Sequence, residues 1–333
     1  KQAGFLLLQS ATITSMSIIS NCTAIAIKDA AATLVKGDLV AFPTETVYGL
    51  GADATNEGAI ARIYKVKGRP VGHPLIVHIS SLANLDKWAR DIPEYAVNLA
   101  RAFWPGPMTL VLPRTDLAKN FITGSQDNVG IRVPSHTVAL ALLKEFESQG
   151  GLGVAAPSAN RFGKVSPTTA QAVSDELSNY LTSADLILDG GPCAVGVEST
   201  IIDCTQSLPV IIRTGEVSTQ MIEELLLIKL PVFDTQSNQI KAPGLLTSHY
   251  SPNAKVFLTG TPAPGDGFIA PIGVKTPDEV IRLAAPKNNT EYAHALYNAL
   301  RQGDALGIKN IYAVLADDIG VGAAINDRLR KAA

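Results

Sequence analysis

Cysteine is scarce in this sequence, and the three residues present show no metal-binding or disulfide pattern. Cys22, Cys193 and Cys204 are the whole set among 333 residues, and no C-x-x-C pair occurs. Zinc sites and disulfide-rich secreted domains use closely spaced cysteines. Cys193 and Cys204 are near enough in sequence to pair, but we expect buried free thiols. The cysteine usage therefore argues against zinc and predicts a reducing, cytoplasmic location.

Long apolar runs and a strong excess of charge are also missing. The run from Phe5 to Leu8 is followed by polar residues, so it is too short to span a membrane and argues against a secretory signal. A net charge of −2 and a pI near 6.2 give no general attraction to nucleic acid. The charge balance favours a small-molecule substrate and predicts little direct nucleic-acid binding and no membrane association.

Hydrophobic residues, by contrast, make up 46% of the chain, which is enough for two domains with their own cores. Strand-like and helix-like runs alternate, and several short strands follow one another closely, so we expect a twisted, mixed sheet in an α/β domain. The predicted helices are Ile27–Lys36, Glu94–Phe103, Thr137–Glu147, Thr169–Leu177 and Ser218–Leu227. The predicted strands begin near Leu39, Leu75, Met108, Val129, Val154, Leu186, Ser199 and Val210.

The periodicity disappears between residues 229 and 253, where Gln, Ser, Asn, Pro and Gly accumulate. We therefore predict a first domain over 16–228, a linker over 229–253 and a small Rossmann-like α/β domain over 254–333. In that second domain the expected strands are Lys255–Leu258, Gly267–Ile272 and Ile311–Leu315, and the expected helices are Glu291–Arg301 and Ala323–Arg330. Residues 1–15 are predicted to be a leader or upstream extension.

Two neighbouring motifs indicate a binding site for an anion. The segment KGRPVGHPLIVH (67–78) places Lys67, Arg69, His73 and His78 around one apolar strand, and such cations suit phosphate oxygens. The hydroxyl-rich segment PTETVYGLG (43–51) precedes a helix that Asn56 should cap and that should run to about Val66. The two segments therefore flank one helix and are expected to reach one pocket.

These motifs, together with GIRVP (130–134), APSAN (156–160), GVESTI (196–201) and IIRTG (211–215), resemble the YrdC-like threonylcarbamoyl-AMP synthases. KAPG (241–244) and SHYSP (248–252) resemble the linker of the long, two-domain form. The resemblance implies a nucleotidyltransferase that condenses L-threonine, bicarbonate or CO₂, and ATP to threonylcarbamoyl-AMP and pyrophosphate. It also implies a downstream transferase that completes threonylcarbamoyladenosine in transfer RNA.

The resemblance also implies the roles of single residues. Lys67 and Arg69 match the catalytic, phosphate-binding pair. The matched threonine-site residues are Thr46, His78, Arg132, Ala156 and Ser199. The matched ATP-site residues, besides that pair, are His73, Ser158, Ser166 and Arg213. Thr109 is a marginal candidate beside Trp104, which we expect in the core. Magnesium is expected with ATP, held by the triphosphate and water rather than by a protein metal site.

Each assignment has a structural alternative. Lys67 and Arg69 suit a solvated basic turn, and His78 suits an ordinary strand end. An arginine inside an apolar strand, such as Arg132, needs a counter-charge, which an internal salt bridge supplies as well as a substrate carboxylate does. Ser166 is suited to capping the helix that follows it. We expect the functional roles, with both roles compatible for Ser166.

The linker is predicted to act as a lid. Pro243 and Gly244 favour a turn, and the aromatic ring of Tyr250 is suited to covering a nucleotide. A rigid spacer is the alternative. Two further functions compete with the synthase: a non-catalytic RNA-binding or ribosome-assembly module, which the lack of a basic surface counts against, and a carbamoyltransferase of the hydrogenase-maturation type, whose zinc-finger cysteine pairs this chain lacks.

Overall fold

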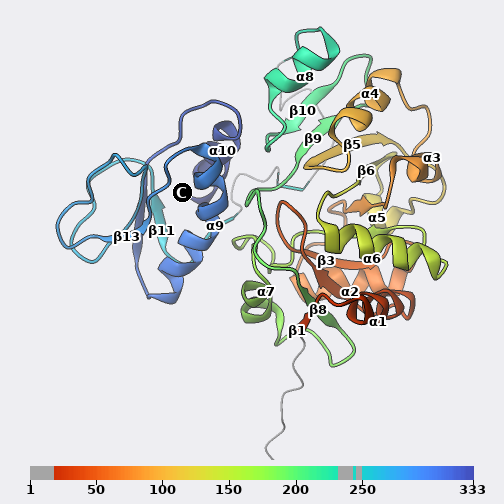
Figure 1. The fold of residues 1–333 in the computed structure, drawn as a ribbon, viewed down its shortest axis with the longest axis horizontal. Coiled ribbons are helices and arrows are strands. Elements are labelled where there is room, and N and C mark those ends of the chain that lie inside the picture. The colour runs from red at the N-terminus through yellow and green to blue at the C-terminus, as the bar shows by residue number, and fades with distance from the viewer. Residues whose placement is uncertain (1–18, 232–242, 245–249) are drawn as a thin grey trace, which may run out of the picture.

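The computed structural model describes residues 19–231, 243–244 and 250–333, which form two sheets with separate helical layers (Figure 1). The predicted extension at 1–15 and most of the predicted linker lie outside the described residues. The helices are α1 (Ala24–Val35), α2 (Glu57–Lys67), η1 (Leu82–Asn84), α3 (Leu85–Trp88), α4 (Glu94–Phe103), α5 (Asn120–Thr123), α6 (Thr137–Ser148), α7 (Ala170–Leu177), α8 (Thr219–Leu226), α9 (Asn289–Ala305) and α10 (Gly322–Ala332). None of the helices within these ranges has the length and apolar character needed to cross a membrane.

The larger sheet has ten strands, which follow the spatial order β1-β8-β2-β3-β7-β4-β6-β5-β9-β10. They are β1 (Ile19–Asn21), β2 (Val40–Phe42), β3 (Gly49–Asp53), β4 (Ile76–His78), β5 (Met108–Pro113), β6 (Asn128–Arg132), β7 (Val154–Ala155), β8 (Leu186–Asp189), β9 (Thr200–Asp203) and β10 (Val210–Arg213). Strand β4 pairs in parallel with β6 but antiparallel with β7. The predicted mixed sheet is therefore confirmed.

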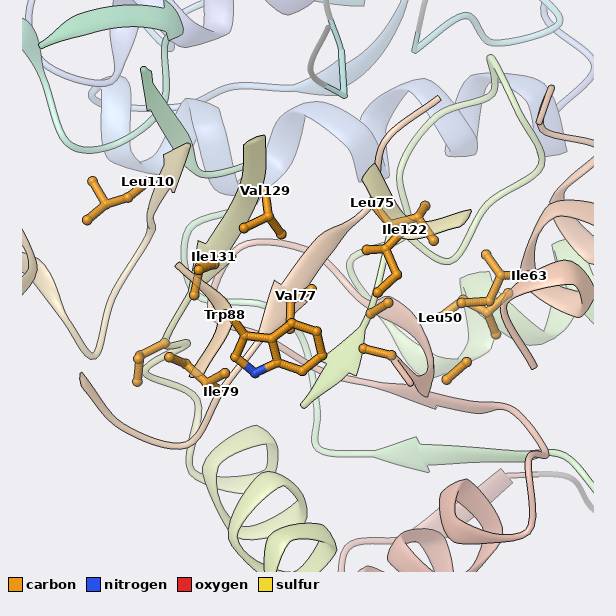
Figure 2. Packing of buried hydrophobic residues seen from close by; sticks show 14 of the residues in the cluster. Leu50, Ile63, Leu75, Val77, Ile79, Trp88, Leu110, Ile122, Val129 and Ile131 are labelled. Carbon is orange, nitrogen blue, oxygen red and sulfur yellow. The ribbon is translucent and has the colours of Figure 1, made fainter. Parts of the chain in front are cut away.

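Helices cover both faces of this sheet, because successive strand residues point to opposite sides. In β2, Val40 and Phe42 belong to one apolar cluster with α1 and α6, whereas Ala41 belongs to the cluster on the other face. Figure 2 shows part of that second cluster, where the Trp88 ring lies next to Val77. These two apolar clusters, one on each face of the sheet, fix the positions of the strand ends that carry the sequence motifs.

Helix α2 begins and ends as its sequence predicts. The Asn56 side chain accepts a hydrogen bond from the backbone N–H of Ala59 at 3.0 Å, and Ile60 and Ile63 are buried. Gly68 ends the helix with φ +59°, a left-handed conformation that glycine adopts without strain. The chain therefore turns between Lys67 and Arg69, which fixes the direction of both cations.

The second sheet has four parallel strands in the order β11-β14-β12-β13: β11 (Lys255–Phe257), β14 (Asn310–Ala313), β12 (Gly267–Ile269) and β13 (Ile281–Ala284). Helices α9 and α10 lie on its side nearest the larger unit (Figure 1). The predicted fold class, a mixed-sheet unit followed by a small Rossmann-like α/β unit, is confirmed, and the sheet of the second unit is parallel. Strands β1, β3 and β13 were not predicted.

Candidate active site

A cavity of about 50 Å³ lies where the carboxyl ends of several central strands meet the described linker residues. Its walls contain cationic, hydroxyl and small side chains from segments far apart in the sequence. The lining residues are Thr46, Val47, Arg69, Ile76, His78, Arg132, Ala156, Pro157, Ser158, Glu198, Ser199, Arg213, Pro243, Gly244 and Tyr250. Most of the predicted site residues therefore share one cavity, whereas Lys67, His73 and Ser166 are not among the residues that line it.

Strand register brings His78 and Arg132 together, because they are direct partners in the parallel pair β4–β6. His78 is 3% exposed. Burial, and after it the positive charge of Arg132, lowers the pKa of His78 to about 3. The imidazole is therefore neutral near pH 7 and is able to accept a hydrogen bond inside the cavity.

Arg132 already has a counter-charge within the protein. Its Nη2 lies 2.6 Å from Oε1 of Glu45, and its Nη1 donates to Oγ1 of Thr46 at 2.9 Å. The internal salt bridge that competed with substrate binding is thus present, although Arg132 also lines the cavity. Sequence reasoning missed Glu45, which lies between two threonines of PTETVYGLG and has no pattern of its own that marks it as a partner.

Ser199 is held by residues from two directions. Its Oγ lies 2.8 Å from Oγ1 of Thr109 and accepts a hydrogen bond from Nη2 of Arg213 at 3.0 Å. Arg213 also donates from Nη1 to the carbonyl of Pro243 at 2.9 Å. One guanidinium thus connects the predicted threonine wall to the linker, and Thr109 supports Ser199 without lining the cavity.

Lys67 and Arg69 are buried, which excludes the solvated basic turn that was the structural alternative for this pair. Arg69 is 7% exposed, lines the cavity and donates from Nη2 to the carbonyl of Pro74 at 3.1 Å. Lys67 is 2% exposed, and its Nζ donates to the carbonyls of Ser158 and Asn160, both at 2.5 Å. Burial, and after it the charge of Arg69, lowers the pKa of Lys67. In this structure Lys67 therefore shapes the APSAN loop rather than the cavity surface.

His73 and Ser166 lie beside the cavity. The His73 ring makes an edge contact with Phe162, at 5.4 Å between ring centroids, and Arg69 lies over the same Phe162 ring at 5.6 Å. Ser166 does not cap the following helix; Thr169 caps α7 instead. The Ser166 hydroxyl donates to Oε1 of Glu198 at 2.6 Å. Sequence reasoning missed both Phe162, which lies outside the named motifs, and Glu198, because nothing in the sequence marks these contacts.

The described linker residues lie against the same cavity. Tyr250 is 1% exposed and stacks on Tyr297 of α9, at 5.8 Å between ring centroids. The backbone N–H of Ser251 donates to the carbonyl of Gly163 at 2.9 Å, which ties this part of the chain to the first unit. Pro243, Gly244 and Tyr250 therefore supply one wall of the cavity.

The described residues do not offer a cage for a divalent metal. No group of three His, Cys, Asp or Glu side chains with suitable geometry occurs in 19–231, 243–244 and 250–333. Glu198, a carboxylate in the cavity wall, already accepts hydrogen bonds on both oxygens. Magnesium carried by ATP stays a prediction.

The three cysteines, which are all described, are free, as expected.

Three buried arginines, a neutral histidine and several hydroxyls lie in one cavity, and this chemistry suits a small molecule that carries negative charge. A family profile described as "Telomere recombination", for Sua5, YciO and YrdC proteins, matches residues 32–215. The profile of the threonylcarbamoyl-AMP synthase C-terminal domain matches residues 217–333. The chain belongs to the Sua5/YciO/YrdC family, in its two-domain form.

Relatives from distant organisms match nearly the whole chain. A threonylcarbamoyl-AMP synthase from Pyrococcus abyssi is 40% identical over 92% of this chain and 93% of its own, and one from Bacillus subtilis is 39% identical over 92% of each. The crystal structure of P. abyssi Sua5 complexed with L-threonine superposes with a TM-score of 0.84 at 39% identity, covering 95% of this chain and 97% of that one. These relatives form a class of nucleotidyl-transferring enzymes.

Proposed function

We propose that this protein is an ATP-dependent threonylcarbamoyl-AMP synthase. The observation that carries the proposal is the single cavity that gathers Arg69, His78, Arg132 and Arg213 from three separate motifs. Two anionic reactants, a carbamate and a triphosphate, must approach each other during the reaction. Fixed cations in a site shielded from water lower the cost of that approach, so positioning and electrostatics supply most of the catalysis.

Threonine is assigned to the wall around Arg132. A guanidinium has five N–H donors, so Arg132 is able to bind the substrate carboxylate while it keeps Glu45 and Thr46 as partners. Neutral His78, Ser199 and the backbone at Ala156 complete this wall. The Arg213 and Thr109 contacts fix the Ser199 hydroxyl, so the pocket should be rigid enough to select one amino acid.

ATP is assigned to the wall that contains Arg69, Ser158, Arg213 and Tyr250. Burial lowers the pKa of Arg69 to about 10, which still leaves it charged near pH 7. The ATP-site prediction also included Lys67, His73 and Ser166. We now assign them indirect roles: Lys67 sets the path of the APSAN loop, His73 packs on Phe162, and Ser166 holds Glu198.

The proposed chemistry requires no covalent bond to the enzyme. Bicarbonate supplies CO₂ and releases water after protonation, and the threonine amine attacks CO₂ to give a carbamate and one proton. A carbamate oxygen then attacks the α-phosphorus of ATP. The bond from that phosphorus to the bridging oxygen breaks, and pyrophosphate leaves. The arginines stabilise the negative charge that concentrates between the two reactants in the transition state.

The linker is proposed to act as a lid. The described residues of the linker fill one side of a cavity of about 50 Å³, whereas small-molecule sites usually measure roughly 300–1,000 Å³. Pro243, Gly244 and Tyr250 must therefore shift before a nucleotide enters and are then able to close over it, which excludes water from the carbamate. This lid role is part of the proposal, as are the domain bounds 16–228, 229–253 and 254–333.

The product is a mixed anhydride, so a transferase that attacks its carbonyl must consume it. We propose that this transferase modifies transfer RNA in the cytoplasm and that magnesium accompanies ATP.

The experiment that tests the function is pyrophosphate release by the purified chain. With ATP and bicarbonate present, release should depend on L-threonine and saturate with it. Release that is equally fast without any amino acid would rule out the synthase and point to a nucleotide hydrolase.

A further inference from the structure

Glu198 is an unexpected residue in a cavity proposed to hold a triphosphate, because its carboxylate repels phosphate oxygens. It lines the cavity and is 6% exposed. Oε1 accepts from Oγ of Ser166 at 2.6 Å, and Oε2 accepts from Oη of Tyr297 at 2.9 Å and from Nε of Arg328 at 2.8 Å. Two of these three donors, Tyr297 and Arg328, come from the C-terminal unit.

Arg328 is the positive partner of this carboxylate. It lies on α10, is 1% exposed, and donates from Nη2 to the carbonyl of Thr214 at 3.0 Å. Its guanidinium carbon lies 5.1 Å from the centre of the Tyr250 ring, which is the aromatic wall of the cavity. A fully buried guanidinium from one unit thus contacts both a carboxylate and an aromatic residue that line the cavity of the other.

The charged and titratable groups around Glu198 come from every adjoining element. Besides Arg328, they are Asp327 on α10, Tyr297 on α9, Arg213 on β10 and Tyr250 of the linker. Burial alone would raise the pKa of Glu198, but Arg328, and after it Arg213, lowers it to about 2. Among the described residues, Arg213 is the second cation that acts on this carboxylate, and the proposed function needs Arg213 for ATP.

We propose that Arg328 is a positioning residue of the C-terminal unit, which neutralises Glu198 and thereby leaves the charge of Arg213 free for the triphosphate. This inference rests on the proposed function. It assigns the C-terminal unit a defined electrostatic contribution to nucleotide binding, beyond its contribution to the stability of the interface. The same helix also holds the linker, since Nζ of Lys331 donates to the carbonyl of Gly244 at 2.8 Å.

A second ion pair between the units serves as a matched control. Nη1 of Arg301, on α9, lies 3.0 Å from Oε2 of Glu176 on α7, and neither residue lines the cavity. Replacing Arg301 removes an interface ion pair of similar kind but leaves the charge of Glu198 paired. A change found in Arg328 variants and missing from Arg301→Gln therefore reports on the cavity rather than on docking.

The test measures KM for ATP and for threonine in full-length Arg328→Met, as ratios to wild type between pH 5.5 and 9. An unpaired carboxylate beside the triphosphate should raise KM for ATP about 10- to 100-fold at pH 8, with a smaller effect on KM for threonine. The ratio of KM for ATP in Arg328→Met to that in wild type should fall as the pH is lowered from 9 to 5.5. Without Arg328, Glu198 should take up a proton within this pH range and lose its negative charge. Arg301→Gln should show a flat ratio.

The double variant Glu198→Gln/Arg328→Met separates charge from packing and guards against misfolding of the single variant. Relative to Glu198→Gln alone, it should show no further rise in KM for ATP and no pH-dependent ratio. A further rise of the size seen in Arg328→Met, or a flat ratio in Arg328→Met itself, would overturn the proposal. If wild type releases no pyrophosphate with threonine, the proposed function has failed instead.

Discussion

At the scale of single residues, each of the three described arginines that line the cavity is held by a protein oxygen. Arg69 donates to a carbonyl, Arg132 pairs with Glu45, and Arg213 bonds Ser199 and Pro243. Burying a charge is costly unless hydrogen bonds and a counter-charge compensate it. The cavity can therefore keep several cations in place before any substrate enters.

Arg69→Gln should lower kcat/KM for ATP by about 10²–10³-fold, because it removes one buried positive charge that stabilises the negative charge of the transition state. Pyrophosphate release with saturating threonine measures the loss. Lys65→Gln is the control, since Lys65 is an exposed cation in the last turn of α2, just before the turn that carries Arg69. Near-normal turnover in a folded Arg69→Gln protein would remove Arg69 from the site.

Arg132→Met should weaken threonine binding and also destabilise the fold by about 3–5 kcal/mol, because it leaves Glu45 as an unpaired buried charge. Glu45→Gln/Arg132→Met should recover most of the stability without recovering threonine affinity. Calorimetric titration with threonine and thermal unfolding provide the two readouts. Wild-type affinity in the double variant would mean that Arg132 serves only the internal salt bridge.

At the scale of elements, the described part of the linker is tightly constrained at the Gly244 turn. Gly244 has φ +84°, and a Cβ there would overlap the hydroxyl of Tyr250 and lie 3.2 Å from Cδ of Arg213. The turn therefore depends on glycine for two reasons, the backbone conformation and the close approach of the two side chains.

Gly244→Ala should raise KM for ATP several-fold while leaving thermal unfolding of the first unit nearly unchanged, because the lid no longer closes without strain. Gly265→Ala is a matched control: Gly265 has φ +85°, but a Cβ there meets nothing within 4 Å. The Gly265→Ala variant should have the same backbone strain of roughly 1–2 kcal/mol, but at a position outside the cavity. Equal KM values for the two variants would argue against the lid.

Elements with a clear pattern could be predicted from the sequence. Helix α4 has the predicted bounds Glu94–Phe103, because Pro93 precedes it and its buried residues follow a helical spacing. Strand β3 was missed because Gly49–Asp53 is rich in small residues and has little strand propensity. It is a strand because β2 and β7 flank it, and Phe42 and Val154 occupy the space above Gly51.

The site was partly predictable for a similar reason. Motifs identified the cations and hydroxyls, which are the residues that a ligand would contact. They did not identify Glu45, Glu198 or Arg328, since each acts through a protein partner. Arg328 and Glu198 are 130 positions apart in sequence, and only the docking of α10 brings them to 2.8 Å.

At the scale of the whole molecule, the two units meet through charges that are buried in the interface. Glu198 has a pKa of about 2, against an ordinary value of 4.5. A carboxyl whose pKa is lowered by folding stabilises the protein above its ordinary pKa, and that contribution disappears as the pH falls toward its folded pKa. The interface should therefore weaken between about pH 4.5 and pH 2.

Glu198→Gln should unfold at a lower temperature than wild type at pH 7, and the difference should shrink steadily as the pH falls from 5 to 2. The lowered pKa of Glu198 contributes on the order of 3 kcal/mol to the free energy of unfolding at pH 7. Calorimetric scans of both proteins at matched ionic strength measure it, with Glu224→Gln, at an exposed position on α8, as the control. A difference that stays constant over this range would contradict the assigned ion pair.

The most direct test of the proposed function is to follow the carbon of ¹³C-bicarbonate into the product. With ATP and L-threonine, mass spectrometry should detect threonylcarbamoyl-AMP that carries one labelled carbon, in a one-to-one ratio with pyrophosphate. Omitting either threonine or bicarbonate should abolish both products. Pyrophosphate formed with AMP alone, and no labelled adduct in rapidly quenched samples, would contradict the account.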